Sequence, residues 1–254
     1  MRLVSYNIRF GGGRRVALIG AVLAALRPDV VLLQEATDPV AVDRIARAAG
    51  LNHVFRQGGW SVAAITREPP DDLQWHRPGR ARGFLEVDPA GGEGLRLLGM
   101  HLPAGLSSRG ERARLRSVES LLEWAGGTAD DRTLIVGDLN SVARGDVVTV
   151  AGMPLWLRLL LRFDGGIRTE VQDRLAAAGW VDAFRHLHPG EPGFTLPATA
   201  PRVRLDYVLV PRPLLPNVAA CAPAIDVPLA ARASDHLPLV AEIDDRGPGT
   251  LAGG

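Results

Sequence analysis

Short apolar runs recur along the chain, and polar or glycine-rich stretches separate them. Several of these runs are apolar throughout, which is typical of β-strands that are covered on both faces. The pattern predicts strands at Leu3–Ile8, Val30–Gln34, Ser61–Thr66, Leu95–His101, Thr133–Gly137, Val203–Val210 and Leu237–Ile243.

Some segments between the predicted strands have the apolar periodicity of an α-helix. In Arg15–Arg27 and Ser108–Trp124 the apolar side chains repeat on one face, and polar side chains occupy the other. A shorter helix is predicted at Arg174–Ala178, with Gly179 as its C-cap. The alternation of strands and helices predicts an α/β protein in which helices lie outside stacked sheets.

The connecting stretches are rich in glycine and proline. Arg67–Arg82 and Pro89–Gly94 are therefore expected to be loops. No shift in composition or long linker divides the chain, so we expect a single domain over residues 1–245 and a flexible tail over 246–254.

Composition narrows the class of protein. Apolar residues make up 46% and charged residues 22%, as in ordinary globular proteins, and the net charge of +1 does not by itself indicate a nucleic-acid-binding protein. All 29 basic residues are arginines, which favours a bacterial, GC-rich genome and weakens arguments from any single arginine. One cysteine excludes an internal disulfide, and without a signal peptide or a membrane-spanning stretch we expect a cytoplasmic protein.

Acids, amides and histidines gather at the ends of the predicted strands. Asp206 is unusual because it lies inside the otherwise apolar run Leu205–Val210, where a carboxylate needs a specific partner. His236 is the obvious candidate, since a carboxylate orients an imidazole and raises its basicity. The candidate site residues are Asn7, Glu35, His101, Asp138, Asn140, Asp206, Asp235 and His236.

Each of these residues also has a simpler interpretation. Asn7 and Asp235 are compatible with turns, Glu35 with a helix cap, and His101 with a buried core histidine. If the candidates converge, two carboxylates about 4 Å apart repel by about 4 kcal/mol at an effective dielectric constant near 20. A divalent cation offsets that repulsion, and oxygen ligands favour Mg²⁺ or Mn²⁺ over Zn²⁺.

Six short motifs follow one another in a familiar order. The chain resembles the endonuclease/exonuclease/phosphatase superfamily from residue 3 to about residue 243, and the resemblance implies a four-layer α-β-β-α sandwich with one active site at the strand ends. The motifs are Ser5-Tyr6-Asn7-Ile8-Arg9, Leu33-Gln34-Glu35, Gly99-Met100-His101-Leu102, Gly137-Asp138-Leu139-Asn140, Arg204-Leu205-Asp206-Tyr207 and Ser234-Asp235-His236.

The resemblance also implies the role of each residue in hydrolysis of a phosphodiester or phosphomonoester. Glu35 binds the Mg²⁺ or Mn²⁺ ion with Asn7 beside it, and Asp235 is a further ligand or a support. Asp206 and His236 form a dyad that acts on the phosphate, and Asp138 orients or deprotonates the attacking water. Asn140, with Asn7, holds the phosphate, and His101 contacts it and protonates the leaving oxygen.

Arg9 departs from the abasic-site endonuclease branch, which has an aspartate there. Together with His101, it makes the chain more similar to the deoxyribonuclease, sphingomyelinase and phosphatase branches. The second metal ion of the family is therefore in doubt, and Arg9 is expected either to bind phosphate or to form an ion pair with Glu35. A non-catalytic member of the fold is the remaining alternative, although the expected catalytic positions are all occupied.

Three segments bear on the choice among DNA, RNA, phospholipid and small phosphate esters as the substrate. Met153–Phe163 is apolar apart from two arginines, which suits either a peripheral membrane contact or a helix packed on the core or on a second copy. The arginines of 77–82 and 109–116 either line a nucleic-acid groove or form a solvated face. No obligate protein partner is indicated.

Overall fold

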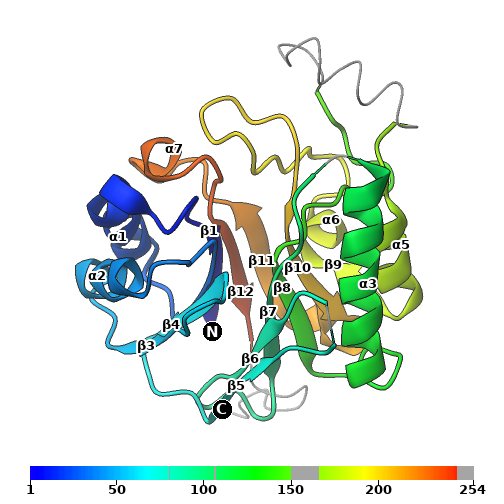
Figure 1. Cartoon of the computed structure of the whole chain (residues 1–254), viewed down its shortest axis with the longest axis horizontal. Helices are drawn as coiled ribbons and strands as arrows, with labels where there is room; N and C mark the ends of the chain where they lie inside the picture. Colours follow the sequence, from blue (N-terminus) through cyan, green and yellow to red (C-terminus); the bar gives the residue numbers. More distant parts are fainter. Residues whose placement is uncertain (80, 106, 150–165, 245–254) are drawn as a thin grey trace, which may run out of the picture.

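A computed structural model of the whole chain describes residues 1–79, 81–105, 107–149 and 166–244. Two six-stranded sheets are stacked face to face, and helices cover their outer faces (Figure 1). The four-layer α-β-β-α sandwich implied by the sequence is therefore confirmed.

The first sheet brings together the two ends of the described chain. Its strand order is β11-β12-β1-β2-β4-β3, with β1 parallel to β2 and antiparallel to β12. The bounds are β1 Arg2–Asn7, β2 Val30–Gln34, β3 His53–Phe55, β4 Val62–Thr66, β11 Val218–Pro223 and β12 Leu239–Ile243.

The second sheet comes from the middle of the chain. Its order is β5-β6-β7-β8-β10-β9, with β7 parallel to β8 and β10 antiparallel to β8. The bounds are β5 Asp72–His76, β6 Phe84–Asp88, β7 Arg96–His101, β8 Thr133–Asp138, β9 Trp180–Asp182 and β10 Asp206–Pro211.

Helices flank the two sheets on opposite sides. On the first sheet α1 (Val16–Leu26) and α2 (Pro39–Ala49) form the outer layer, with the short α7 (Ala230–Ala233) beside α1 (Figure 1). On the second sheet α3 (Ser108–Trp124) and α5 (Glu170–Ala177) do so, whereas α6 (Ala183–Leu187) packs against β10 and β11. Short 3₁₀ helices occur at η1 (Gly13–Arg15) and η2 (Arg212–Asn217).

Three apolar layers hold the sandwich together. Leu32 and Val136 belong to the layer between the sheets, Ile19 and Leu33 to the layer under α1 and α2, and Val118 to the layer under α3. Residues that alternate along a strand thus face two different cores, which is why the strands are apolar throughout. This burial leaves the strand ends as the places where polar side chains can gather.

The structure corrects several predicted boundaries. Arg67–Arg82 is not all loop, because β5 occupies residues 72–76, and the strand predicted at Val203–Val210 begins only at Asp206. The helix predicted at Arg174–Ala178 begins earlier, at Glu170, and its C-cap is Ala178. The single domain over residues 1–245 with a flexible tail over 246–254 stays a prediction, and 245–254 lie outside the described residues.

The contact between α1 and α2 depends on Gly20. A Cβ atom built at Gly20 would lie 2.3 Å from Cβ of Ala48 on α2, so the helices can approach this closely only without a side chain there. We expect Gly20→Ala to lower the free energy of unfolding by about 1–3 kcal/mol, as overpacking does in other cores. Urea denaturation measures the loss. Ala24→Ser on the exposed face of α1 is the control, and an equal effect of both substitutions would contradict the packing argument.

Candidate active site

The candidate residues meet at one edge of the sandwich because of how the strands are paired. The parallel pair β1 and β2 places Asn7 opposite Gln34, next to Glu35, and the parallel pair β7 and β8 places His101 opposite Asp138. The antiparallel partner β10 begins at this edge, with Asp206 opposite Asp138.

Asp206 and His236 form a buried pair. His236 Nδ1 lies 2.9 Å from Asp206 Oδ2, and both side chains are almost completely shielded from solvent. Asp206 is the first residue of β10 rather than an interior one, so the mid-strand position predicted for it is wrong. The argument that it needs a partner nevertheless holds, because the residue is completely buried.

Asp138 lies at the centre of the cluster. Its Oδ2 atom accepts a hydrogen bond from Asn7 Nδ2 at 2.9 Å, and it lies 3.8 Å from His236 Nε2 and 4.0 Å from His101 Nε2. The backbone amide of Asn140 donates to Asp138 Oδ1 at 2.9 Å. One carboxylate therefore faces two imidazoles and is fixed by two donors.

The strand end that carries Asp138 requires a glycine before it. Gly137 has a φ of 146°, and a Cβ atom there would lie 1.9 Å from the carbonyl oxygen of Met100 on β7. A side chain at this position would push β7 and β8 apart, and these two strands carry His101 and Asp138.

Asn7 connects this cluster to Glu35. Besides its bond to Asp138, Asn7 Nδ2 lies 3.3 Å from Glu35 Oε1, and Asn7 Oδ1 accepts from the amide of Arg9 at 2.9 Å. Glu35 Oε2 accepts from the amide of Phe10 at 2.6 Å. The ends of β1 and β2 thus form a second acidic position beside Asp138.

Asn140 and Asp235 have partners in different segments of the chain. Asn140 has a left-handed φ of 47°, and its side-chain Nδ2 donates to the carbonyl of Leu102 at 3.0 Å. Asp235 Oδ2 lies 3.3 Å from Arg9 Nε. The ion pair predicted between Arg9 and Glu35 is therefore wrong: the Arg9 guanidinium pairs with Asp235 instead.

Burial and mutual repulsion govern the protonation of the cluster. Burial, followed by the nearby Asp206 carboxylate, raises the pKa of Asp138 above its usual range. Burial alone lowers the pKa of His236, but the carboxylates of Asp206 and Asp138 outweigh it and raise the value to about 10. Burial lowers the pKa of His101 to about 4. At neutral pH, before any cation binds, His236 is charged and His101 is neutral.

The cluster offers two environments for a cation. Donor atoms of Asp138, Asp206 and His236 all lie within 4.8 Å of one another, but the charged His236 opposes a second positive charge there. Glu35 offers two carboxylate oxygens beside it; one accepts from Asn7 Nδ2 and the other from the amide of Phe10. A hard divalent cation such as Mg²⁺ fits that chemistry, and among the described residues Asp206 Oδ1 is also buried without a hydrogen-bond partner.

Residues outside the predicted set support the cluster. Ser234 Oγ donates to the carbonyl of Asn7 at 2.7 Å, which joins the segment before β12 to the end of β1. Tyr207 Oη donates to the carbonyl of Ser141 and accepts from the amide of Ala143, so β10 holds the segment that follows Asp138. Both residues lie in the quoted motifs, but their roles depend on partners far away in the sequence.

Arg204 also helps to hold the segment that follows Asp138. Its side chain is fully buried, lies 2.8 Å from Asp146 Oδ2 and 2.5 Å from Asp182 Oδ2, and stacks 4.5 Å from the ring of Tyr207. Asp146 is also fully buried, so this is an internal ion pair. It attaches the chain beyond Asn140 to the residue that lies two positions before Asp206.

The two arginine groups predicted to line a nucleic-acid groove differ in their exposure to solvent. Trp60, Arg77 and Arg82 help to line a groove of about 280 Å³, and Ser61 in that groove accepts from the amide of Ala36, next to Glu35. Arg114, by contrast, is buried against Glu111 and cannot belong to a solvent-facing groove. Residue 80 and the apolar segment Met153–Phe163 lie outside the described residues.

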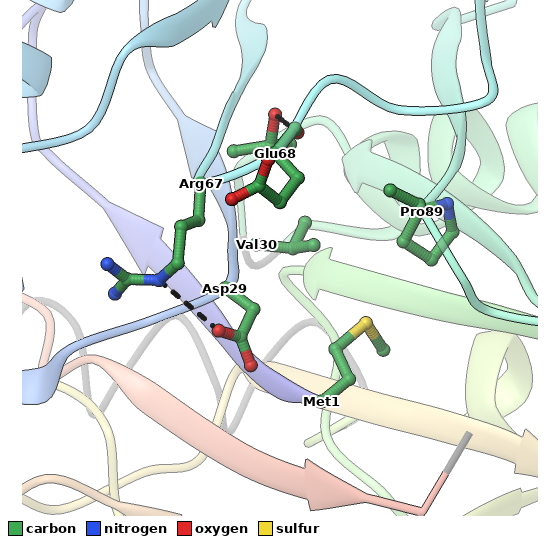
Figure 2. Close-up of a pocket in the computed structure, with 8 residues that line it drawn as sticks. Met1, Asp29, Val30, Arg67, Glu68 and Pro89 are labelled. Carbon is green, nitrogen blue, oxygen red and sulfur yellow. Dashed lines mark hydrogen bonds and ion pairs between the residues drawn. The ribbon is translucent and has the colours of Figure 1, made fainter. Parts of the chain in front are cut away.

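Another cavity lies at the opposite edge of the sandwich. It has a volume of about 250 Å³ and lies where β1 and β2 begin, with Met1, Asp29, Arg67 and Pro89 around it (Figure 2). The Asp29–Arg67 ion pair drawn there is half-exposed. Because β1 and β2 carry Asn7 and Glu35 at their other ends, this cavity is separate from the candidate site.

Comparison with known proteins agrees with this fold. The sequence profile of the Endonuclease/Exonuclease/phosphatase family matches residues 4–236, whereas no curated protein matches the sequence. An AP endonuclease from Archaeoglobus fulgidus has a similar structure, with a TM-score of 0.75, 22% identity, and coverage of 96% of this chain and 99% of that one.

Two Neisseria structures are also similar. The 3′ phosphatase NExo bound to a product DNA hairpin has a TM-score of 0.72 and 18% identity, with 96% of this chain and 99% of that chain covered. The 3′-5′ exonuclease NExo from Neisseria meningitidis has a TM-score of 0.71 and 19% identity, with coverage of 96% and 100%. At these identities the structures support the shared fold.

The fold and the family profile define a class of phosphoester-hydrolysing enzymes built on two stacked sheets. The chain belongs to the Endonuclease/Exonuclease/phosphatase family. Among the described residues, no helix is both long and apolar enough to cross a bilayer. The cytoplasmic location and the bacterial source stay predictions.

Proposed function

We propose that the protein is a divalent-metal-dependent phosphodiesterase that cleaves nucleic acid by in-line attack of water. The Asp206–His236 pair facing Asp138 is the observation that carries this proposal. A hydrogen-bonded carboxylate and imidazole beside a second buried carboxylate can together hold a phosphate and a nucleophilic water.

The roles follow from the position of each group. Asp138, with its raised pKa, accepts the proton of the attacking water. His236 is held by Asp206 and stabilises charge on the non-bridging phosphate oxygens. His101, neutral and 4.0 Å from Asp138, donates a hydrogen bond that stabilises the leaving oxygen, which takes its proton from water, and Asn140 contacts the phosphate.

Mg²⁺ or Mn²⁺ is the cation that we propose for the position formed by Glu35 and Asn7, with Asp235 as a further ligand or a support. When bound, such an ion polarises the phosphate and neutralises its charge. The carboxylate oxygens of Glu35 and the positive charge on His236 support this placement over the Asp138–Asp206–His236 cluster itself.

Nucleic acid is the substrate class that the remaining observations favour. The structural neighbours include a 3′ phosphatase bound to a product DNA hairpin, and the groove with Trp60, Arg77 and Arg82 adjoins Glu35. Aromatic and cationic groups together suit a nucleotide chain. A phospholipid remains the second candidate because of Met153–Phe163, whose apolar sequence suits a membrane surface.

The test is a substrate screen with the purified protein. We expect hydrolysis of DNA or RNA with Mg²⁺ or Mn²⁺, loss of hydrolysis with EDTA, and recovery when the ion is added back. Phospholipid vesicles and small phosphate esters are assayed in parallel. Calorimetric titration with Mn²⁺ separates the enzyme from a non-catalytic member of the fold: neither binding nor hydrolysis would refute the proposal.

A further inference from the structure

The turn that leaves β1 has an unusual backbone. Residues 9–13 all have positive φ values, and the first two, Arg9 at 53° and Phe10 at 48°, are not glycines. Side chains disfavour this left-handed region, and bulky ones are outliers in it. The chain therefore holds Phe10 in a conformation that it would not adopt on local preference alone.

Several contacts hold the turn rigidly against its surroundings. Arg15 donates to the carbonyls of Ile8, Arg9 and Ala233, at 3.2, 2.5 and 2.9 Å. The amide of Gly11 donates to the carbonyl of Glu35 at 2.8 Å. These bonds connect the turn to the end of β2 and to the segment that precedes His236, so the candidate site and the turn form one unit.

The Phe10 ring is exposed to solvent and does not pack in the hydrophobic core. Its exposed fraction is 79%, the highest of any large hydrophobic side chain in the described part of the chain. Its backbone amide nevertheless donates to Glu35 Oε2 at 2.6 Å, so the residue is adjacent to the proposed cation position. The Arg9 guanidinium lies 5.9 Å from the ring centre and also pairs with Asp235.

We propose that Phe10 is a substrate-binding residue whose ring stacks on a nucleobase next to the scissile phosphate. This inference rests on the proposed function and names the recognition element of the same site. The Phe10 ring can stack on a planar base while the neighbouring Arg9 guanidinium attracts the phosphate attached to that nucleoside. An acyl chain would need a broader apolar surface than one phenyl group.

The experiment compares two oligomers with the same phosphate backbone. One is single-stranded oligothymidylate, and the other carries tetrahydrofuran residues that lack bases. For Phe10→Ala we expect KM for oligothymidylate to rise about tenfold, with a smaller change in kcat, so the preference for the base-bearing oligomer is largely lost. Phe10→Trp should restore that preference and Phe10→Leu should not, because stacking needs a planar ring.

The outcomes separate this inference from the proposed function. Ile225→Ala, which removes another strongly exposed apolar side chain, is the control and should keep the wild-type preference. If Phe10→Ala keeps that preference, or if Phe10→Leu restores it as well as Phe10→Trp does, base stacking is wrong while hydrolysis stands. A wild-type protein that cleaves neither oligomer contradicts the stacking role, whereas the nucleic-acid phosphodiesterase is contradicted only if the protein cleaves no RNA either.

Discussion

His236→Ala is expected to lower kcat for phosphodiester hydrolysis at least about 10²-fold. Within the cluster, His236 is the imidazole that hydrogen-bonds to a buried carboxylate, through the 2.9 Å contact with Asp206. Its raised pKa keeps it positively charged at neutral pH, where it can stabilise the negative charge that develops on the phosphate. Alanine removes that charge and leaves two buried carboxylates facing each other.

Steady-state kinetics with saturating Mg²⁺ measure this loss. Circular dichroism and thermal unfolding must show that the variant folds, because the substitution also leaves Asp206 buried without its partner. His188→Ala is the matched control, since His188 is a partly exposed histidine that pairs with Glu191 away from the cluster. Full activity in the folded His236→Ala protein would overturn the mechanism.

The sequence was sufficient for much of the fold because the buried strands are apolar on both faces. β2 was predicted to the residue, whereas the edge strands β3, β5, β9 and β11 and the buried interior strand β6 were missed. The edge strands are short, and exposed or half-exposed positions mix with buried ones in β5 and β11. The spacing of apolar residues along the sequence indicates which side chains are buried. Edge strands are only partly buried, so their apolar pattern is weak. Their pairing depends on neighbours that are distant along the chain, which no local pattern records.

The candidate site could be predicted only as a set of residues. That Asp206 needs a partner follows from its apolar surroundings, and the structure places His236 beside it. The ion pair of Arg9 with Asp235 could not be predicted, because it depends on a backbone turn with positive φ values. The precise roles of these side chains stay predictions until the variants have been measured.

The supporting residues were the hardest to find from sequence. Arg204 resembles any other arginine in a chain without lysine, and its partner Asp146 lies 58 positions away. The informative feature is its complete burial, which only the folded structure reveals. Residues that hold the site in position are therefore harder to predict from sequence than the candidate catalytic residues.

Arg204→Met is expected to lower the free energy of unfolding by about 3–5 kcal/mol, the usual cost of leaving one member of a buried ion pair without its partner. Methionine fills a similar volume but leaves the buried carboxylate of Asp146 without its main partner. Urea denaturation measures the loss. Arg185→Met is the matched control: Arg185 contacts the same carboxylate at 2.8 Å but is partly exposed, so about 1 kcal/mol is expected.

A double variant shows whether the loss comes from the unpaired charge. Arg204→Met with Asp146→Asn should recover part of the stability, because the buried carboxylate is then gone. If the double variant is no more stable than Arg204→Met, the loss reflects packing against Tyr207 instead. The ion pair also fixes the segment after Asn140 to the start of β10, so a folded Arg204→Met protein should lose catalytic rate as the alignment of Asp138 with Asp206 loosens.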